Sequence, residues 1–241
     1  WGYELYIAVM ALMMLPWAFK PFWGLVSDQV PFKGERRKPY ALIGVAINIM
    51  AWILVPTVDM SILTVLSLTI VSLGVAILDT SCDGLLVDIV HYEQTNPAIV
   101  GAQTHGQLQS KQWSFRSTGE LAGFLIGAVF EPYLDMPLLA LTMVLISLGI
   151  VVCILFLIEP SISNDTIKPT KTIIGGFARL VCDSSTNRNI ALYIIVIGIA
   201  PTVSTPLEKY FINVLCFTAI ETACVEVAGI LGLIVGSSVY G

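Results

Sequence analysis

Residues 136–158 read MPLLALTMVLISLGIVVCILFLI, a stretch without a charged side chain. A helix crosses a membrane hydrocarbon core about 30 Å thick with about 20 consecutive apolar residues. This stretch is therefore long enough to span a membrane. Uncharged windows of comparable length lie at residues 40–58, 60–78 and 189–207. These windows decide the fold, because they predict several membrane-spanning helices.

The composition agrees with a membrane protein and excludes several other classes. Of the 241 residues, 56% are hydrophobic and 12% are charged, whereas soluble domains carry about 25% charged residues. A soluble fold of this length would have too few charges to cover its surface. The net charge of −5 also argues against a nucleic-acid partner. An ordinary cytosolic enzyme, a disordered regulator and a nucleic-acid binder are therefore not expected.

The predicted fold class is an all-α, polytopic bundle with about seven transmembrane helices. Two shorter apolar windows, 5–19 and 227–241, add to the long ones, and so does a window at 117–130 that contains one acid. The predicted helices cover residues 4–28, 40–58, 60–90, 113–133, 136–158, 188–207 and 220–241.

The basic residues predict how the bundle is oriented. If the helices alternate, most of the twelve Lys and Arg residues fall in loops on one side of the membrane. The positive-inside rule makes that side cytosolic. The longest polar stretch, residues 159–187, lies on the same side. We expect it to be a cytosolic linker between an N-terminal helical half (1–158) and the start of a C-terminal half (188–241).

Neither the cysteines nor any catalytic motif indicates an enzyme. The five cysteines are widely spaced and form no CxxC pair or Cys/His set, so no metal site and no disulfide framework are predicted. No GxSxG, HExxH, P-loop or GxGxxG pattern occurs in a fitting context. We therefore predict a protein that is not an enzyme and that uses neither a metal nor a cofactor.

Residues 15–40 carry a family resemblance and read LPWAFKPFWGLVSDQVPFKGERRKPY. The pattern Gly24-Leu-Val-Ser-Asp28, followed by Gly34 and Arg36-Arg37-Lys38, resembles the loop between helices two and three of the major facilitator superfamily. The surrounding residues 16–17, 20–21 and 37–40 narrow the resemblance to the folate–biopterin transporter family. Residues 79–84, 113–127 and 211–240 are similar to later helices of that family.

The resemblance implies a fold and a function. The family fold has twelve helices in two halves of six, so the seven predicted here would match the second to the eighth. The first helix and the last four would then lie outside this sequence. The implied function is secondary transport of folate or pteridine-type organic anions by alternating access, with protons as a coupling ion. A plasma membrane and a plastid envelope both fit, and membrane protein partners are compatible with it.

Asp28, Arg36 and Arg37, together with Gly24, are the candidate gating residues. Gly24 would let neighbouring helices approach closely. A carboxylate at a helix C-terminus opposes the helix dipole, so Asp28 should need a cationic partner or backbone donors. Asp28 with Arg37 would then hold the cytosolic side shut in one state. The alternative is that the basic run 36–38 is only a positive-inside anchor.

Lys20 is the candidate counter-charge for an anionic substrate. It lies eight residues before Asp28, about 12 Å deeper along a helix, where a charge is costly and should face protein, water or an anion. Pro21 should weaken the local helix and favour a bend. Trp17 would offer a flat face to a pterin ring. The alternatives are snorkelling or a structural ion pair for Lys20, and an interfacial belt for the tryptophan.

Asp79 and Asp83 are the candidate proton-binding residues. They are four residues apart and should share one helix face, where repulsion would favour a proton on one of them. Alternatively, both pair with Lys20 and Arg116 as fixed struts. The predicted substrate site comprises Lys20, Trp17, Asp79, Asp83 and Arg116.

Three further features are expected to be structural. Arg116 should pair with Glu120 one turn away. The stripe Gly119-x-x-x-Gly123-x-x-x-Gly127 should let helix backbones touch in lipid. Asp88 is expected to be a solvated helix end.

A rival function belongs to a different class. The same bundle could be a non-transporting membrane subunit, or an assembly partner in a larger complex derived from a truncated transporter. The charges inside the predicted helices favour transport, because ionisable residues are costly in lipid unless they serve a function.

Overall fold

The computed structural model describes residues 3–32, 34–58, 62–95, 105–130, 135–157, 159 and 214–240, with a few isolated positions between 185 and 211. Within these ranges the regular secondary structure is helical, apart from an isolated bridge between Phe32 and Glu35, and the connecting residues are turns, bends or coil. The all-α prediction is therefore confirmed. The helices are α1 (Tyr3–Ala18), α2 (Lys20–Gln29), α3 (Lys38–Leu54), the 3₁₀ turn η1 (Val55–Thr57), α4 (Ile62–Thr95), α5 (His105–Phe130), α6 (Met136–Phe156) and α10 (Ala219–Tyr240).

Four helical spans in the described ranges are long and apolar enough to cross a membrane: Val9–Gln29, which covers most of α1 and all of α2, Lys38–Thr57, Ile62–Gln94 and Met136–Phe156. A shorter apolar helix covers Ala223–Val239. The membrane-bundle prediction holds for these segments. The helix predicted at 188–207 falls almost entirely outside the described residues. The helix predicted at 113–133 begins earlier, at His105. The polar residues before 113 therefore belong to the helix as well.

The single helix predicted over 4–28 is wrong in one respect, because it is two helices that meet at Phe19. Proline has no amide hydrogen and its ring clashes with the preceding turn. Pro16 and Pro21 flank the break on either side. The amide of Phe19 donates back to the carbonyl of Pro16 over 3.2 Å, a tighter turn than an α-helix makes. The chain resumes as α2 at Lys20.

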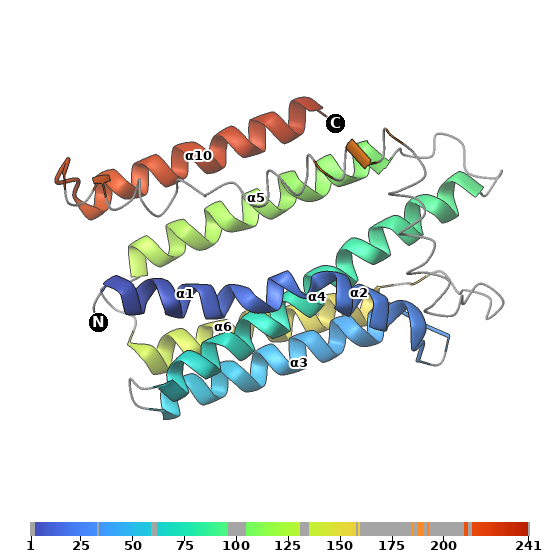
Figure 1. The fold of residues 1–241 in the computed structure, drawn as a ribbon, viewed down its shortest axis with the longest axis horizontal. Coiled ribbons are helices and arrows are strands. Elements are labelled where there is room, and N and C mark those ends of the chain that lie inside the picture. The colour runs from blue at the N-terminus through green and yellow to red at the C-terminus, as the bar shows by residue number, and fades with distance from the viewer. Residues whose placement is uncertain are drawn as a thin grey trace. The chain divides into compact units, whose positions relative to one another are not determined.

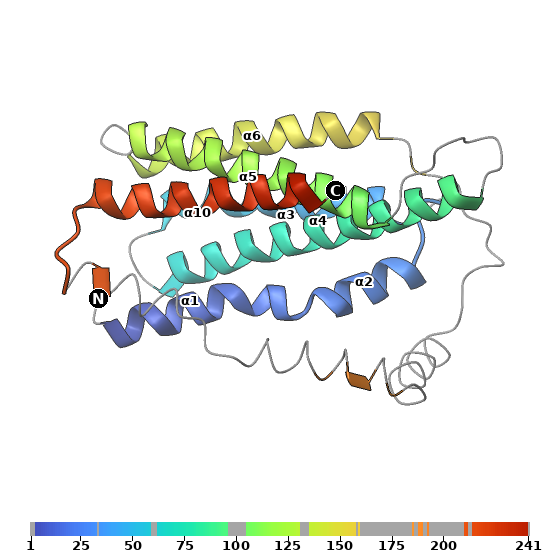
Figure 2. The same ribbon diagram turned by 90° about the horizontal axis from the view of Figure 1, so that it is seen from above.

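The chain forms two compact units. The first comprises residues 1–108 and 130–167, and holds α1 to α4 and α6 (Figure 1). Within it α4 packs against α1, α2 and α3, and α3 packs in turn against α6. In Figure 2 α1 and α2 follow one another along α4. The long helix α4 is therefore the element that joins the polar segment around Lys20 to the rest of the unit.

Two glycines set the contact between α3 and α4. A Cβ atom on Gly44 would lie 2.8 Å from the carbonyl oxygen of Gly74, and one on Gly74 would lie 2.7 Å from the carbonyl oxygen of Gly44. These separations are shorter than real Cβ contacts, so both positions require glycine. The two backbones touch here, as small residues allow between helices in lipid.

A buried polar contact joins α3 to α6 near the same level. The Ser147 hydroxyl donates to Asn48 Oδ1 over 3.0 Å, and the Asn48 amide donates to the Val71 carbonyl of α4 over 3.3 Å. Ala41, Val45 and Ile154 form the apolar core beside it. One asparagine therefore links three helices.

The second unit comprises residues 109–129 and 168–241, and holds most of α5 together with α10. The hydroxyls of Ser114 and Ser238 lie 3.2 Å apart across these two helices. Thr218 and Glu221 cap the start of α10 reciprocally; the Thr218 amide and hydroxyl bonds lower the pKa of Glu221. No described atom within 4 Å would meet a Cβ on Gly119 or Gly123, so their predicted role as a helix contact stays a prediction.

Candidate functional site

Lys20 is placed by the break between α1 and α2. It is the first residue of α2, with Phe19 as the cap and Pro21 in the first turn. The N-terminus of a helix carries partial positive charge, so a lysine there is electrostatically unfavourable unless an anion is near. Because the break places Lys20 at a helix N-terminus, its ammonium needs carboxylates nearby.

The carboxylates come from α4. The Lys20 ammonium donates to Asp79 Oδ2 and, over 3.2 Å, to Asp83 Oδ2. It also lies 5.2 Å from the centre of the Trp17 ring, within cation–π range. The Lys20 side chain is 27% exposed, and those of Asp79 and Asp83 are 17% and 49% exposed. We call Trp17, Lys20, Asp79 and Asp83 the Lys20 cluster.

The geometry brings together four of the five residues predicted for the substrate site. The fifth, Arg116, belongs to α5 in the second unit, where its guanidinium pairs with Glu120 over 3.2 Å and lies 5.3 Å from the Trp113 ring. The predicted Arg116–Glu120 pair is confirmed. The alternative prediction was that both aspartates pair with Lys20 and Arg116. Both aspartates do contact Lys20, whereas Arg116 contacts Glu120 and Trp113 of its own helix.

The chemistry of the Lys20 cluster follows from its charges. One ammonium faces two carboxylates one helical turn apart, so the ionised group carries excess negative charge. An incoming anion would have to displace a carboxylate from the ammonium to bind there. The cluster therefore holds two anionic groups on one ammonium.

A second ionic group lies where α2 ends and α3 begins. The Arg37 guanidinium contacts Asp28 Oδ1 over 2.6 Å, Asp88 Oδ2 over 3.2 Å and the Ser27 hydroxyl over 2.6 Å. Arg36 adds a longer contact to Asp88 Oδ1, at 3.6 Å. Asp28 therefore has the cationic partner predicted for it. We call Ser27, Asp28, Arg36, Arg37 and Asp88 the Arg37 cluster; it joins α2, α3 and α4.

The prediction for Asp88 is wrong. Its side chain is 17% exposed and contacts both arginines, so it is not a solvated helix end. The reason is that α4 continues to Thr95, which leaves Asp88 well inside the helix. One sequence signal could have identified it: Gly84 and Asp88 are four residues apart and share a helix face.

Gly84 makes room for the Arg37 guanidinium. A Cβ atom at this position would lie 2.6 Å from Arg37 Cζ and 2.7 Å from Nε. Gly24 differs, since its Cβ would lie 3.6 Å from Thr80 Cγ2, an ordinary van der Waals contact. The close approach predicted at Gly24 therefore does not require glycine. The tighter position is Gly84 on α4, where the nearest atoms belong to the Arg37 side chain.

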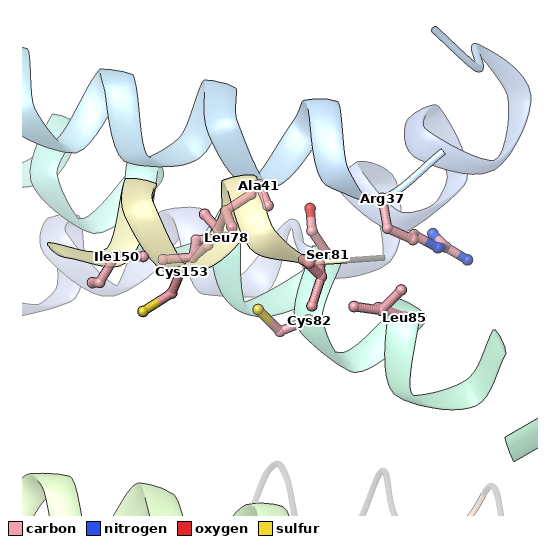
Figure 3. A pocket seen from close by; sticks show the side chains of 10 residues that line it. Arg37, Ala41, Leu78, Ser81, Cys82, Leu85, Ile150 and Cys153 are labelled. Atoms are coloured by element: carbon pink, nitrogen blue, oxygen red, sulfur yellow. The ribbon is translucent and has the colours of Figure 1, made fainter. Parts of the chain in front are cut away.

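A pocket of about 250 Å³ lies between α3, α4 and α6, next to the Arg37 cluster (Figure 3). Arg37 lines one end, and Ile150 and Cys153 line the other. The remaining lining is mostly apolar and includes Cys82. No residue of the Lys20 cluster lines it, so this pocket is not the predicted substrate site.

Comparison with known proteins matches the sequence to one family. The BT1 family model matches residues 4–234. Probable folate-biopterin transporters 4 and 7 of Arabidopsis thaliana are 28% and 27% identical to the chain, over 49% and 48% of its length. The folate-biopterin transporter of Synechocystis is 32% identical over 56% of the chain. The aligned parts span 24% to 26% of these three relatives. No solved structure matches the chain.

Proposed function

The chain belongs to the BT1 family, and from that premise we propose that it is part of a secondary transporter for folate or pteridine-type organic anions. Its relatives are named folate-biopterin transporters, and its long apolar helices make it an integral membrane protein. The family match favours transport over the non-transporting subunit. It also points away from an enzyme, because the family consists of transporters.

The observation that carries the proposal is the Lys20 cluster within a candidate membrane span. Lys20 would bind a carboxylate of the substrate, and Trp17 would stack on its ring system. Asp79 or Asp83, displaced from the ammonium, would carry the coupling proton. The cost of charges in lipid explains why they occur here only with partners. Substrate binding and proton binding would then be linked, because both depend on the Lys20 ammonium.

The Arg37 cluster would be the gate. We propose that the end of the bundle holding Asp28, Arg36 and Arg37 faces the cytosol, in keeping with the positive-inside rule. Breaking the Asp28–Arg37 pair would release α2 from α3 as the two halves of the transporter rock about a midplane site. Residues 1–158 and 188–241 would belong to these halves, with 159–187 as the linker. Plant and cyanobacterial relatives fit a plasma membrane or a plastid envelope.

Uptake of labelled folate and of a labelled pterin by cells that express the full-length protein tests the proposal. We expect concentrative uptake by the wild type and a loss of about tenfold or more in Lys20→Ala, since a charge-assisted contact is worth about 1.5–3 kcal/mol. Lys111→Ala, which removes the same charge from α5, is the control. Unchanged affinity and rate in Lys20→Ala would exclude this lysine from the site, and absence of uptake by the wild type would overturn the proposed function.

A further inference from the structure

Glu159, three residues beyond the end of α6, caps the start of α3. Its Oε1 accepts the backbone N–H groups of Arg36 and Arg37 over 2.8 and 2.9 Å. Its Oε2 accepts those of Arg37 and Lys38 over 3.1 and 2.9 Å. The first N–H groups of a helix have no partner within the helix and carry partial positive charge, so a carboxylate suits them. The cap residue of α3, Arg37, supplies no such side-chain bond itself.

Lys38 makes the reverse connection. Its ammonium donates to the carbonyl oxygens of Leu155 and Leu157 over 3.2 and 3.0 Å. These are among the last carbonyl groups of α6, which also have no partner within their helix and carry partial negative charge. The acid that follows α6 therefore caps α3, and the lysine that begins α3 caps α6. We call Glu159 and Lys38 the reciprocal clasp.

The clasp fixes the residue on which the gate depends. The backbone of Arg37 is held by Glu159, while its guanidinium reaches Asp28 on α2 and Asp88 on α4. A shift of the end of α6 would therefore move the Arg37 backbone relative to both carboxylates. A cap formed within α3 would satisfy the same N–H groups without transmitting any movement of α6.

We infer that Glu159 and Lys38 are positioning residues of the gate: by joining the ends of α3 and α6, they hold Arg37 against Asp28 and Asp88. The inference rests on the proposed function for its gate, and the contacts that carry it lie within one compact unit. Glu159 is also the first residue of the predicted linker, so the linker begins at a residue bonded to the gate.

Hydrogen exchange in the purified full-length protein tests the clasp independently of any substrate. In Glu159→Gln we expect exchange about tenfold faster at the amides of Arg36, Arg37 and Lys38. We also expect faster exchange in the last turn of α2, which Arg37 holds. Lys38→Met should produce a smaller change in the same direction, without altering the acid. Ser147→Ala is the matched control, because it removes a contact between the same two helices away from the gate.

Transport kinetics separate a gate residue from a simple helix cap. Both clasp variants should change the maximal rate of folate uptake at least threefold and leave KM within twofold, whereas Ser147→Ala should change neither. If Glu159→Gln frees only its own three amides, while the end of α2 and the uptake rate match the Ser147→Ala control, the inference is overturned. Failure of the wild type to carry folate would instead count against the proposed function, with the exchange experiment still testing the clasp.

Discussion

Lys20 and Arg37 each bring one cation to two aspartates, yet they are held in different ways. Both carboxylates that Lys20 contacts belong to α4, and the lysine side chain is 27% exposed. Arg37 is 10% exposed, and its carboxylates come from α2 and α4. A guanidinium is a rigid fork suited to fixed pairs, whereas an ammonium on a flexible stem changes partners readily. The comparison shows that Arg37 joins two other helices, α2 and α4, and it supports the proposal that Lys20 exchanges partners.

The largest expected effect breaks the Arg37 cluster. Removing one partner of a fully buried ion pair costs about 3–5 kcal/mol. We expect Arg37→Met to lower the free energy of unfolding by about 3 kcal/mol, at the low end because Asp28 is 37% exposed. Thermal unfolding in detergent measures it. Arg116→Met is the control: its Glu120 pair is exposed and should be worth about 0–1 kcal/mol. Equal losses would show that burial does not distinguish the two arginines.

The next prediction concerns the two aspartates that share Lys20. Asp79 is 17% exposed and Asp83 is 49% exposed, so solvent screens the second contact more strongly. We expect Asp79→Asn to cost about 1.5–2 kcal/mol, as for a charge-assisted hydrogen bond, and Asp83→Asn less than about 1 kcal/mol.

Uptake assays with and without an inward proton gradient extend this test to function. Asp79→Asn should weaken the response to the gradient more than Asp83→Asn does. If instead Asp83→Asn has the larger effect on both stability and coupling, the exposed carboxylate is the exchangeable partner, and the order of the two aspartates is reversed.

The sequence was sufficient to predict α3, α4 and α6, but not to predict where the helices end. Uncharged windows predict α3, α4 and α6 because the length of an apolar run is a local property. The break at Phe19 was missed, although Pro21 predicted a bend, because the effect of two prolines on a helix depends on what the freed groups meet. The close approach at Gly44 and Gly74 was missed as well, since spacing along one helix does not identify its neighbour.

The same limit applies to the candidate sites. Lys20, Asp79 and Asp83 could be identified because a charge within an apolar run is costly and needs a partner. Glu159 could not be identified, because it caps residues 121 to 123 positions away and looks like an ordinary loop acid. Asp88 was missed because the apolar window ends before the helix does.

The last prediction tests whether the Arg37 guanidinium needs the space beside Gly84. Ala at position 84 would push a methyl group into the Arg37 guanidinium, whereas Ala at position 24 would only contact Thr80. Both changes gain the same helix propensity, about 0.8–1 kcal/mol, so their difference isolates the steric effect. We expect Gly84→Ala to be less stable than Gly24→Ala by about 1–2 kcal/mol in thermal unfolding. If the two variants unfold alike, the guanidinium can move without loss, and Arg37 would be as adaptable as Lys20.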